Sequence, residues 1–141
     1  MSFYLDASAL IPLFKIEESS AVISDWVANL TAPILVSSLV IGEACSGFSR
    51  QVRQGVWDAK LANAAANEVA VWIEARATLV TVLNEDVIAA ADLVKYPIPR
   101  LLMPDAIHLA ICQRLELTLV TLDKDLLTIA TREGVTAICP A

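Results

Sequence analysis

The sequence predicts an α/β fold, a three-layer α/β/α sandwich with a central parallel sheet of about five strands. Short apolar runs rich in β-branched residues alternate along the chain with longer stretches of helical pattern. The short runs are apolar at successive positions, which is typical of strands covered by helices on both faces. The 141 residues contain no Gly/Ser/Pro-rich stretch that would serve as a linker, so we expect a single domain over residues 1–141.

The expected strands are short and separated by polar or helical segments. In chain order they cover residues 3–5, 34–36, 79–82, 117–120 and 136–138. Strands connected through helices run parallel, so their carboxyl ends meet at one edge of the sheet. Ligands of such open sheets bind beyond those carboxyl ends, and we therefore look for functional residues there.

The expected helices are marked by capping residues and by proline. Serine, asparagine or aspartate stands before three of them, where such side chains satisfy the free N–H groups of a first turn. Tyr96 to Pro99 interrupts a helical pattern, whereas Pro104 fits a first turn, in which proline is tolerated. The expected helices cover residues 7–10, 21–30, 39–54, 58–77, 87–95 and 105–115.

The composition is more apolar than that of an ordinary domain, with 57% hydrophobic residues and a mean hydropathy of +0.63. Either the core is large or some apolar surface meets a partner. Ten basic and sixteen acidic residues give a formal net charge of −6, which opposes nonspecific attraction to a polyanion. A nucleic-acid substrate would therefore need basic side chains that are gathered locally or supplied by a second subunit.

We expect a cytoplasmic protein that does not enter a membrane. No apolar stretch reaches the roughly 20 residues of a spanning helix, and Asp6 comes before any signal-like apolar core. The cysteines are odd in number and form no Cys-x-x-Cys pair, so we interpret them as reduced packing residues in apolar surroundings. They are Cys45, Cys112 and Cys139.

Asp6 and Asp123 each follow directly on an expected strand. At that position a side chain projects over the sheet edge where sites form. Both residues also precede a helix, and an N-cap role explains either one alone equally well. Two strand-end aspartates are therefore only an indication of a site.

Glu43 is surrounded in its expected helix by apolar residues such as Val40, Ile41 and Ala44. An unpaired carboxylate buried there would cost several kcal/mol or be forced neutral. A salt bridge to Arg50 or Arg53 is one explanation, and a bound metal ion would resolve the burial better.

Asp105 lies in the first turn of an expected apolar helix, where the helix dipole also favours an acid. Four separate acids at such places are harder to explain individually than together. Carboxylates without histidine or cysteine are the ligands of hard cations, so Asp6, Glu43, Asp105 and Asp123 predict an acidic pocket for Mg²⁺ or Mn²⁺. Such ions activate water against a phosphodiester without a protein nucleophile.

Three further polar residues are supporting candidates. Ser8 and Thr121 carry hydroxyls that would hold a metal-bound water, although Ser8 is equally a local helix-start hydrogen bonder. Asp125 is either a further ligand or a first-turn acid, and we favour the second interpretation. His108 lies one turn past Asp105, but a lone histidine among apolar residues is more often structural, so we place it outside the site.

Four segments in register resemble the PIN-domain family, specifically the VapC-like ribonuclease toxins of type II toxin–antitoxin systems. The segments are residues 4–10 with Asp6, 39–44 with Glu43, 104–110 with Asp105 and 119–126 with Asp123. Each segment alone is weak evidence, but their order and spacing span nearly the whole chain and are fairly specific together.

The resemblance implies a PIN-like sandwich and a Mg²⁺- or Mn²⁺-dependent endoribonuclease. It also implies a homodimer that is inhibited by a small cognate antitoxin. The apolar helical pair at residues 39–54 and 56–77 is our expected site for much of the dimer or antitoxin contact. The residues carried over are Asp6, Glu43 and Asp105 as metal ligands, Asp123 as the fourth acid, and Ser8 and Thr121 as supporting hydroxyls.

The acidic net charge fits poorly with RNA binding. Basic residues would therefore have to line the rim of the acidic pocket. Those we expect there are Arg50, Arg53, Lys60, Arg100 and, close to the metal, Lys124.

Two other classes of function compete with the nuclease. In the first, the fold is a noncatalytic protein-binding module whose acids are only helix caps; the presence of all four acids weighs against it. In the second, the chain is another Mg²⁺-dependent phosphoryl-hydrolysing enzyme or a phosphoacceptor receiver domain, which also place an aspartate after the first strand. Such phosphatases usually have an Asp-x-Asp pair there, where this chain has Asp6-Ala7-Ser8.

Overall fold

The computed structural model of the protein describes residues 1–140, which contain one sheet of five parallel strands. The strands are β1 (Phe3–Leu5), β2 (Ile34–Ser37), β3 (Ala77–Val80), β4 (Thr118–Val120) and β5 (Ala137–Ile138). Their spatial order is β3-β2-β1-β4-β5, so the first strand of the chain lies at the centre of the sheet. In the register, Tyr4 pairs with Leu35 on one side and with Leu119 on the other.

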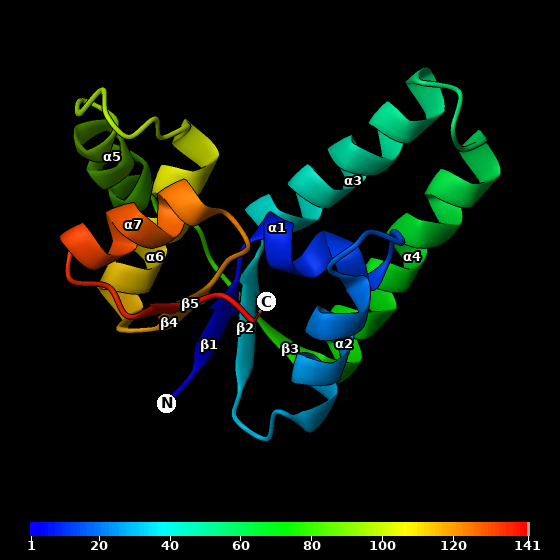
Figure 1. Cartoon of the computed structure of the whole chain (residues 1–141), viewed down its shortest axis with the longest axis horizontal. Coiled ribbons are helices and arrows are strands. Elements are labelled where there is room, and N and C mark those ends of the chain that lie inside the picture. The colour runs from blue at the N-terminus through cyan, green and yellow to red at the C-terminus, as the bar shows by residue number, and fades with distance from the viewer. Residues whose placement is uncertain (141) are drawn as a thin grey trace.

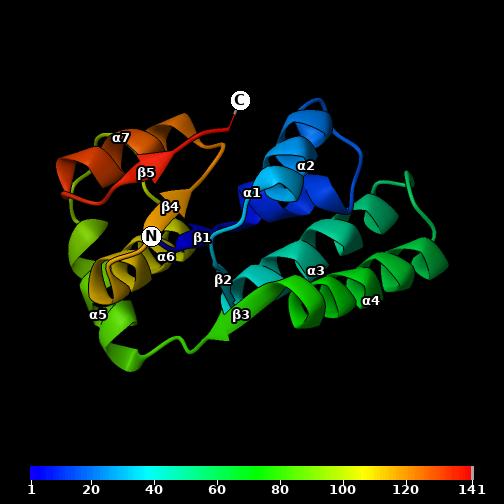
Figure 2. The ribbon, with the colours of Figure 1, turned by 90° about the horizontal axis from the view of Figure 1, so that it is seen from below.

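Two layers of helices enclose the sheet (Figures 1 and 2). The helical elements are α1 (Ala7–Leu10), the 3-10 turn η1 (Ile11–Leu13), α2 (Ser20–Asn29), α3 (Ser38–Arg53), α4 (Ala59–Arg76), α5 (Asn84–Leu93), α6 (Met103–Leu115) and α7 (Lys124–Arg132). Helices α1 to α4 lie on one side of the sheet and α5 to α7 on the other. The predicted α/β/α sandwich with a five-stranded parallel sheet is confirmed. No helix within residues 1–140 is long and apolar enough to cross a membrane.

Most expected elements lie within one or two residues of their predicted places, and β3 differs most among the strands. It covers Ala77–Val80 and not the predicted residues 79–82, because the chain passes from α4 directly into the sheet. Pairing with β2 then aligns Ala77 with Ile34 and Val80 with Ser37. As an edge strand, β3 leaves Leu79 half exposed, whereas every residue of β1 and β4 is buried.

The topology brings several helix starts to one edge of the sheet. Helix α1 begins one residue after β1, α3 directly after β2, and α7 a few residues after β4. Helix α6 ends near the start of β4, at the amino edge of the sheet. Its first turn therefore lies at the carboxyl edge, where the strands end. Four helix N-termini therefore surround the carboxyl edge of the central strands, which is where an open α/β sheet binds ligands.

Aromatic side chains pack within the long helical hairpin of α3 and α4 and between this hairpin and the rest of the protein. Trp57 stacks on Phe48 inside the hairpin, and Trp72 of α4 meets Phe14 edge-on. Leu61 of α4 is half exposed.

The three cysteines are free, as expected, but they differ in their surroundings. Cys112 is buried in α6 and Cys139 is partly buried. The expectation that all three are apolar packing residues is wrong for Cys45, which is exposed because α3 buries only the face that carries Val40, Ala44 and Phe48.

A buried aspartate of α5 forms an ion pair with an arginine of α6. The Asp86 side chain is 2% exposed and accepts two hydrogen bonds from the Arg114 guanidinium, at 2.8 and 2.9 Å. It also accepts the backbone N–H of Leu83 at the start of α5, and Arg114 donates to the Thr81 carbonyl. The connection after β3 is thus fixed by one charged pair that the sequence pattern did not reveal.

Candidate functional site

Asp6 is the most buried acid at the carboxyl edge, with 1% of its surface exposed. Its Oδ1 accepts hydrogen bonds from the Ser8 hydroxyl at 2.6 Å and the Ala9 backbone N–H at 3.0 Å. Its Oδ2 accepts from the Thr121 hydroxyl at 2.6 Å. Burial raises the pKa of Asp6 above its ordinary value, and these hydrogen bonds oppose that rise. The predicted N-cap role is therefore present, together with a position at the centre of the strand-end edge.

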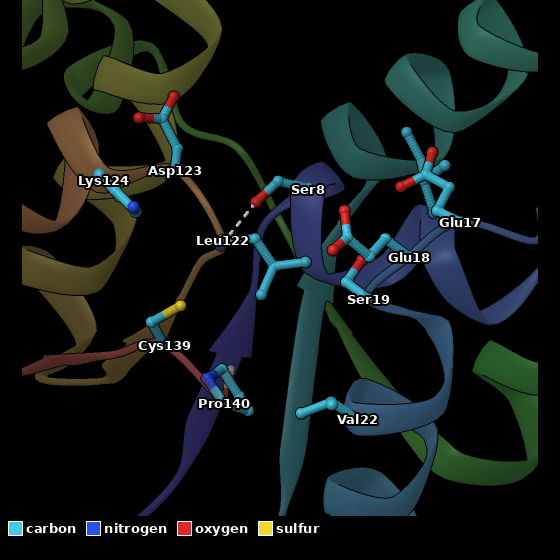
Figure 3. A pocket seen from close by; sticks show the side chains of 11 residues that line it. Ser8, Glu17, Glu18, Ser19, Val22, Leu122, Asp123, Lys124, Cys139 and Pro140 are labelled. Atoms are coloured by element: carbon cyan, nitrogen blue, oxygen red, sulfur yellow. Dashed lines mark hydrogen bonds between the residues drawn. The ribbon is translucent and has the colours of Figure 1, made fainter.

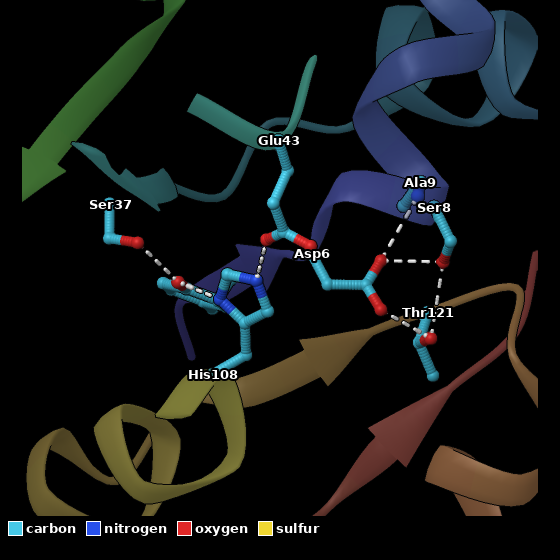
Figure 4. A network of polar contacts seen from close by, with 8 residues as sticks. Asp6, Ser8, Ala9, Ser37, Glu43, His108 and Thr121 are labelled. Atoms are coloured by element: carbon cyan, nitrogen blue, oxygen red, sulfur yellow. Dashed lines mark hydrogen bonds and ion pairs between the residues drawn. The ribbon is translucent and has the colours of Figure 1, made fainter. Parts of the chain in front are cut away.

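Ser8 and Thr121 join the end of β1 to the turn after β4. Each hydroxyl donates to Asp6 and accepts a backbone N–H, from Leu122 to Ser8 at 2.9 Å and from Asp123 to Thr121 at 3.1 Å. Figure 4 shows both hydroxyls beside the Asp6 carboxylate. Their position agrees with the expectation that they support the acids, because they fix the direction in which Asp6 points.

Glu43 extends from the second turn of α3 toward α6 and meets His108 (Figure 4). Its Oε1 lies 2.5 Å from His108 Nε2. On the other side of the imidazole, Nδ1 lies 2.6 Å from the Tyr4 hydroxyl, which in turn lies 2.8 Å from the Ser37 hydroxyl. Tyr4, Ser37 and His108 are fully buried, whereas the Glu43 side chain is 26% exposed.

The structure shows the partners of this acid. The alternative of a salt bridge to Arg50 or Arg53 is not seen, because those side chains belong to the far half of α3, and Arg53 donates to Ser49. His108, which the sequence analysis placed outside the site, is the hydrogen-bond partner of Glu43. The one available signal was its spacing of one turn from Asp105, which puts both residues on the same face of α6.

Asp105 lies in the first turn of α6, partly buried, as expected. Burial raises its pKa most, and the negative charges of Asp6, Glu43 and Asp123 add to the rise, so that the pKa reaches about 6. His108 acts in the opposite direction. The four predicted acids thus share one electrostatic environment, although they come from three helices and a strand end far apart in the sequence.

Asp123 is the N-cap of α7, and its Oδ1 accepts the backbone N–H groups of Asp125 and Leu126. Its side chain is exposed, unlike that of Asp6. Asp125 is an exposed acid in the first turn of α7, the role favoured for it from the sequence. Its carboxylate accepts no hydrogen bond from the described residues.

The donor chemistry of the four acids fits a hard divalent cation, since all their ligand atoms are carboxylate oxygens. Within the described residues, no three His, Cys, Asp or Glu side chains surround one point closely enough to hold an ion. Asp6, Glu43 and Asp123 are each held by hydrogen bonds to neighbouring residues. Each carboxylate has about four lone-pair sites, more than these bonds occupy.

A cavity of about 740 Å³ opens beside the acids (Figure 3). Ser8 and Asp123 border both the cavity and the acid cluster. Its wall is largely apolar, and the charged groups at its rim are Glu17, Glu18 and Lys124. Lys124 is therefore the one expected basic residue that lines this cavity. Arg50 follows Glu43 on the same face of α3, about 10 Å further along by the rise of a helix.

This all-parallel sheet, with acids collected at its carboxyl edge, defines an α/β protein with an acidic candidate site. The chain belongs to the PIN-domain family, whose model matches residues 3–131. The resemblance stated from four short segments is thereby confirmed over almost the whole chain. No curated protein sequence matches the chain.

Solved structures share the fold over nearly their full lengths. Mycobacterium tuberculosis VapC20, described as a sarcin–ricin loop cleaving toxin, has a TM-score of 0.72 and 18% identity, covering 95% of this chain and 96% of that one. VapBC2 from Rickettsia felis, bound to a fragment of its promoter DNA, gives 0.70 and 14%, covering 99% and 98%. VapBC-1 from nontypeable Haemophilus influenzae gives 0.70 and 15%, with the same coverage. At these identities the likeness establishes the fold.

Proposed function

We propose that the protein is a Mg²⁺- or Mn²⁺-dependent endoribonuclease and the toxin of a toxin–antitoxin pair. The observation that carries the proposal is the electrostatic environment of Asp105 at the carboxyl edge of the sheet, where burial and the negative charges of Asp6, Glu43 and Asp123 raise its pKa. A partly buried acid whose pKa is raised by neighbouring acids is costly for the fold, and such costs are typical of functional sites. Membership of the PIN-domain family supports the same activity.

The proposal gives each residue a role. Asp6, Glu43, Asp105 and Asp123 would hold the cation, and Ser8 and Thr121 fix the orientation of Asp6 by donating to both of its oxygens. When bound, the cation would provide water activation at neutral pH and charge stabilisation at the departing oxygen.

The remaining steps place the RNA. Lys124 offers a positive charge to a phosphate at the edge of the cavity, next to Asp123. The apolar wall of the cavity offers a dry surface for the nucleoside beside the scissile bond. No side chain acts as a covalent nucleophile in this scheme.

The test is cleavage of total RNA by the purified protein, freed of any copurifying partner, in Mg²⁺, in Mn²⁺ and in EDTA. Asp105→Asn removes a central charge with little change of shape, and Glu74→Gln, an exposed acid on α4, is the matched control. We expect discrete fragments that require the metal, persist in Glu74→Gln and disappear in Asp105→Asn. Intact RNA together with no measurable metal binding would favour the noncatalytic binding module instead.

We further propose that the protein forms a homodimer and binds a small antitoxin protein. Two of the similar structures, from Rickettsia felis and Haemophilus influenzae, carry the name VapBC. The hairpin of α3 and α4 exposes Val56, Leu61 and Val71, which is apolar surface suited to such contacts. A short reading frame beside this gene should encode a protein that copurifies with the chain and relieves growth arrest on coexpression. Growth arrest that persists during coexpression would contradict the pairing.

A further inference from the structure

A chain of four side chains crosses the interior and ends at the candidate site. It runs from Ser37 on β2 through Tyr4 on β1 to His108 on α6 and Glu43 on α3 (Figure 4). The three contacts measure 2.8, 2.6 and 2.5 Å in that order. Among the described residues, no buried side-chain nitrogen or oxygen lacks a hydrogen-bond partner, so the network is satisfied.

The carboxylate at one end of the network determines which group donates and which accepts in each hydrogen bond. A Glu43 carboxylate only accepts, so His108 Nε2 carries the proton that faces it. When the ring is neutral, its Nδ1 accepts from the Tyr4 hydroxyl, whose pKa burial raises well above the ordinary value of a phenol. The Tyr4 oxygen in turn accepts from Ser37. Each donor in the series has one acceptor, and the ring tautomer follows from its neighbours.

Glu43 depends on this network more than the other acids depend on their partners. Asp6 is held by three hydrogen bonds, two of them from residues two and three positions further along the chain, and Asp123 by two backbone N–H groups. The Glu43 side chain is longer and partly exposed, and its hydrogen bond is to His108. Without that bond it would sample several rotamers, and ordering it again on metal binding would cost side-chain entropy.

We propose that His108, supported by Tyr4 and Ser37, is a positioning residue that holds the Glu43 carboxylate toward the other acids for metal binding. This inference rests on the proposed function. Burying three polar side chains in an α/β core gives no packing advantage over apolar groups of the same volume. A role in holding the partly exposed Glu43 carboxylate at its end explains the network.

The binding experiment measures Mn²⁺ affinity by titration calorimetry in four proteins. His108→Leu removes the donor, and His108→Gln replaces it with an amide N–H. Leu109→Ala, a fully buried neighbour on α6 outside the network, controls for lost stability. We expect roughly tenfold weaker Mn²⁺ binding in His108→Leu, at least partial recovery in His108→Gln, and wild-type affinity in Leu109→Ala. In RNA cleavage, kcat should fall with affinity while the KM for RNA stays constant. Equal affinity in His108→Leu and wild type would overturn the inference.

A second readout separates this inference from the proposed function. The chain has one histidine, so the ring nitrogens give a single, directly assigned pair of ¹⁵N NMR signals. We expect the Nε2–H tautomer in the wild type, lost in Tyr4→Phe and in Glu43→Ala. If the wild-type protein has this tautomer but neither binds Mn²⁺ nor cuts RNA, the proposed nuclease function is refuted, whereas the hydrogen-bond arrangement of the network is supported. A ring with Nδ1–H or with averaged tautomers refutes the positioning role whatever the activity.

Discussion

Asp6 and Asp86 are almost equally buried, at 1% and 2% exposure, but the charged residues around them differ. Each accepts a backbone N–H at the start of a helix. Asp86 also accepts two hydrogen bonds from Arg114. The other two hydrogen bonds of Asp6 come from neutral hydroxyls, and Asp6 lies near Asp105, a second acid.

The pKa values of the two residues reflect this difference. Burial raises the pKa of Asp86, but the hydrogen bonds from Arg114 and Leu83 and the guanidinium charge lower it by more. For Asp6, burial raises the pKa and the bonds from Ser8 and Thr121 do not compensate. Burial of a carboxylate therefore does not mark a site by itself. The indication is a buried carboxylate that the fold supplies with hydrogen bonds and not with a positive charge.

The largest expected effect on RNA cleavage is that of Asp6→Asn. We expect RNA cleavage to fall on the order of 10³-fold, because the variant removes a charge that the proposed cation needs. Thermal stability should not fall, because the change also removes repulsion of Asp105. Single-turnover cleavage and a circular dichroism melt measure both. Retained cleavage in this variant would contradict the proposed site.

Asp86→Asn should show the reverse pattern. The variant loses the ion pair with Arg114 in a buried position, and we expect the free energy of unfolding to fall by about 2 kcal/mol after discounting for the partly exposed guanidinium. Urea titration measures this change, and cleavage at 25 °C should remain. Asp92→Asn, an exposed acid on the same helix, should change neither quantity appreciably. Loss of cleavage in folded Asp86→Asn would erase the distinction between the two aspartates.

Thr121→Val tests how much the hydroxyls contribute to Asp6. The hydroxyl donates to Asp6 and accepts from Asp123 N–H, so its loss should misdirect the carboxylate and reduce kcat by roughly tenfold, the value of a single hydrogen bond to a charged group. Thr118→Val, buried at the other end of β4, is the matched control and should retain full kcat. An equal loss in both variants would point to the strand and not to the hydroxyl.

The smallest expected effect is a pH-dependent stabilisation in Asp105→Asn, measured in EDTA. The folded protein raises the pKa of Asp105 from 3.8 to about 6, so the folded state binds the proton more tightly than the unfolded state. This group therefore favours folding as pH falls from about 6 toward 4, and disfavours it above pH 6. Asp105→Asn should be about 1 kcal/mol more stable than wild type at pH 7.5, with allowance for partial exposure. The difference should vanish near pH 4, and a difference independent of pH would show that Asp105 is not perturbed.

The sequence alone predicted the features that depend on local pattern. Asp6, Asp105 and Asp123 were predicted as site residues because each directly follows a strand or lies in the first turn of a helix, and parallel strands bring such positions to one edge. Their role in a site stays a prediction. The contact of Glu43 with His108 was missed because α3 and α6 meet only through the sheet topology. The same holds for Asp86 and Arg114, whose pairing depends on how α5 packs against α6. Side-chain partners across elements are set by packing, which a single sequence does not encode locally.

The central position of β1 has a consequence for the synthesis of the protein. Its neighbours in the sheet are β2 and β4, so the strand made first remains open on one side until the chain has been translated beyond Val120. The four acids are spread in the same way, and Asp123 is added after β4. A nascent or prematurely terminated chain consequently lacks both the closed sheet and the complete acid cluster.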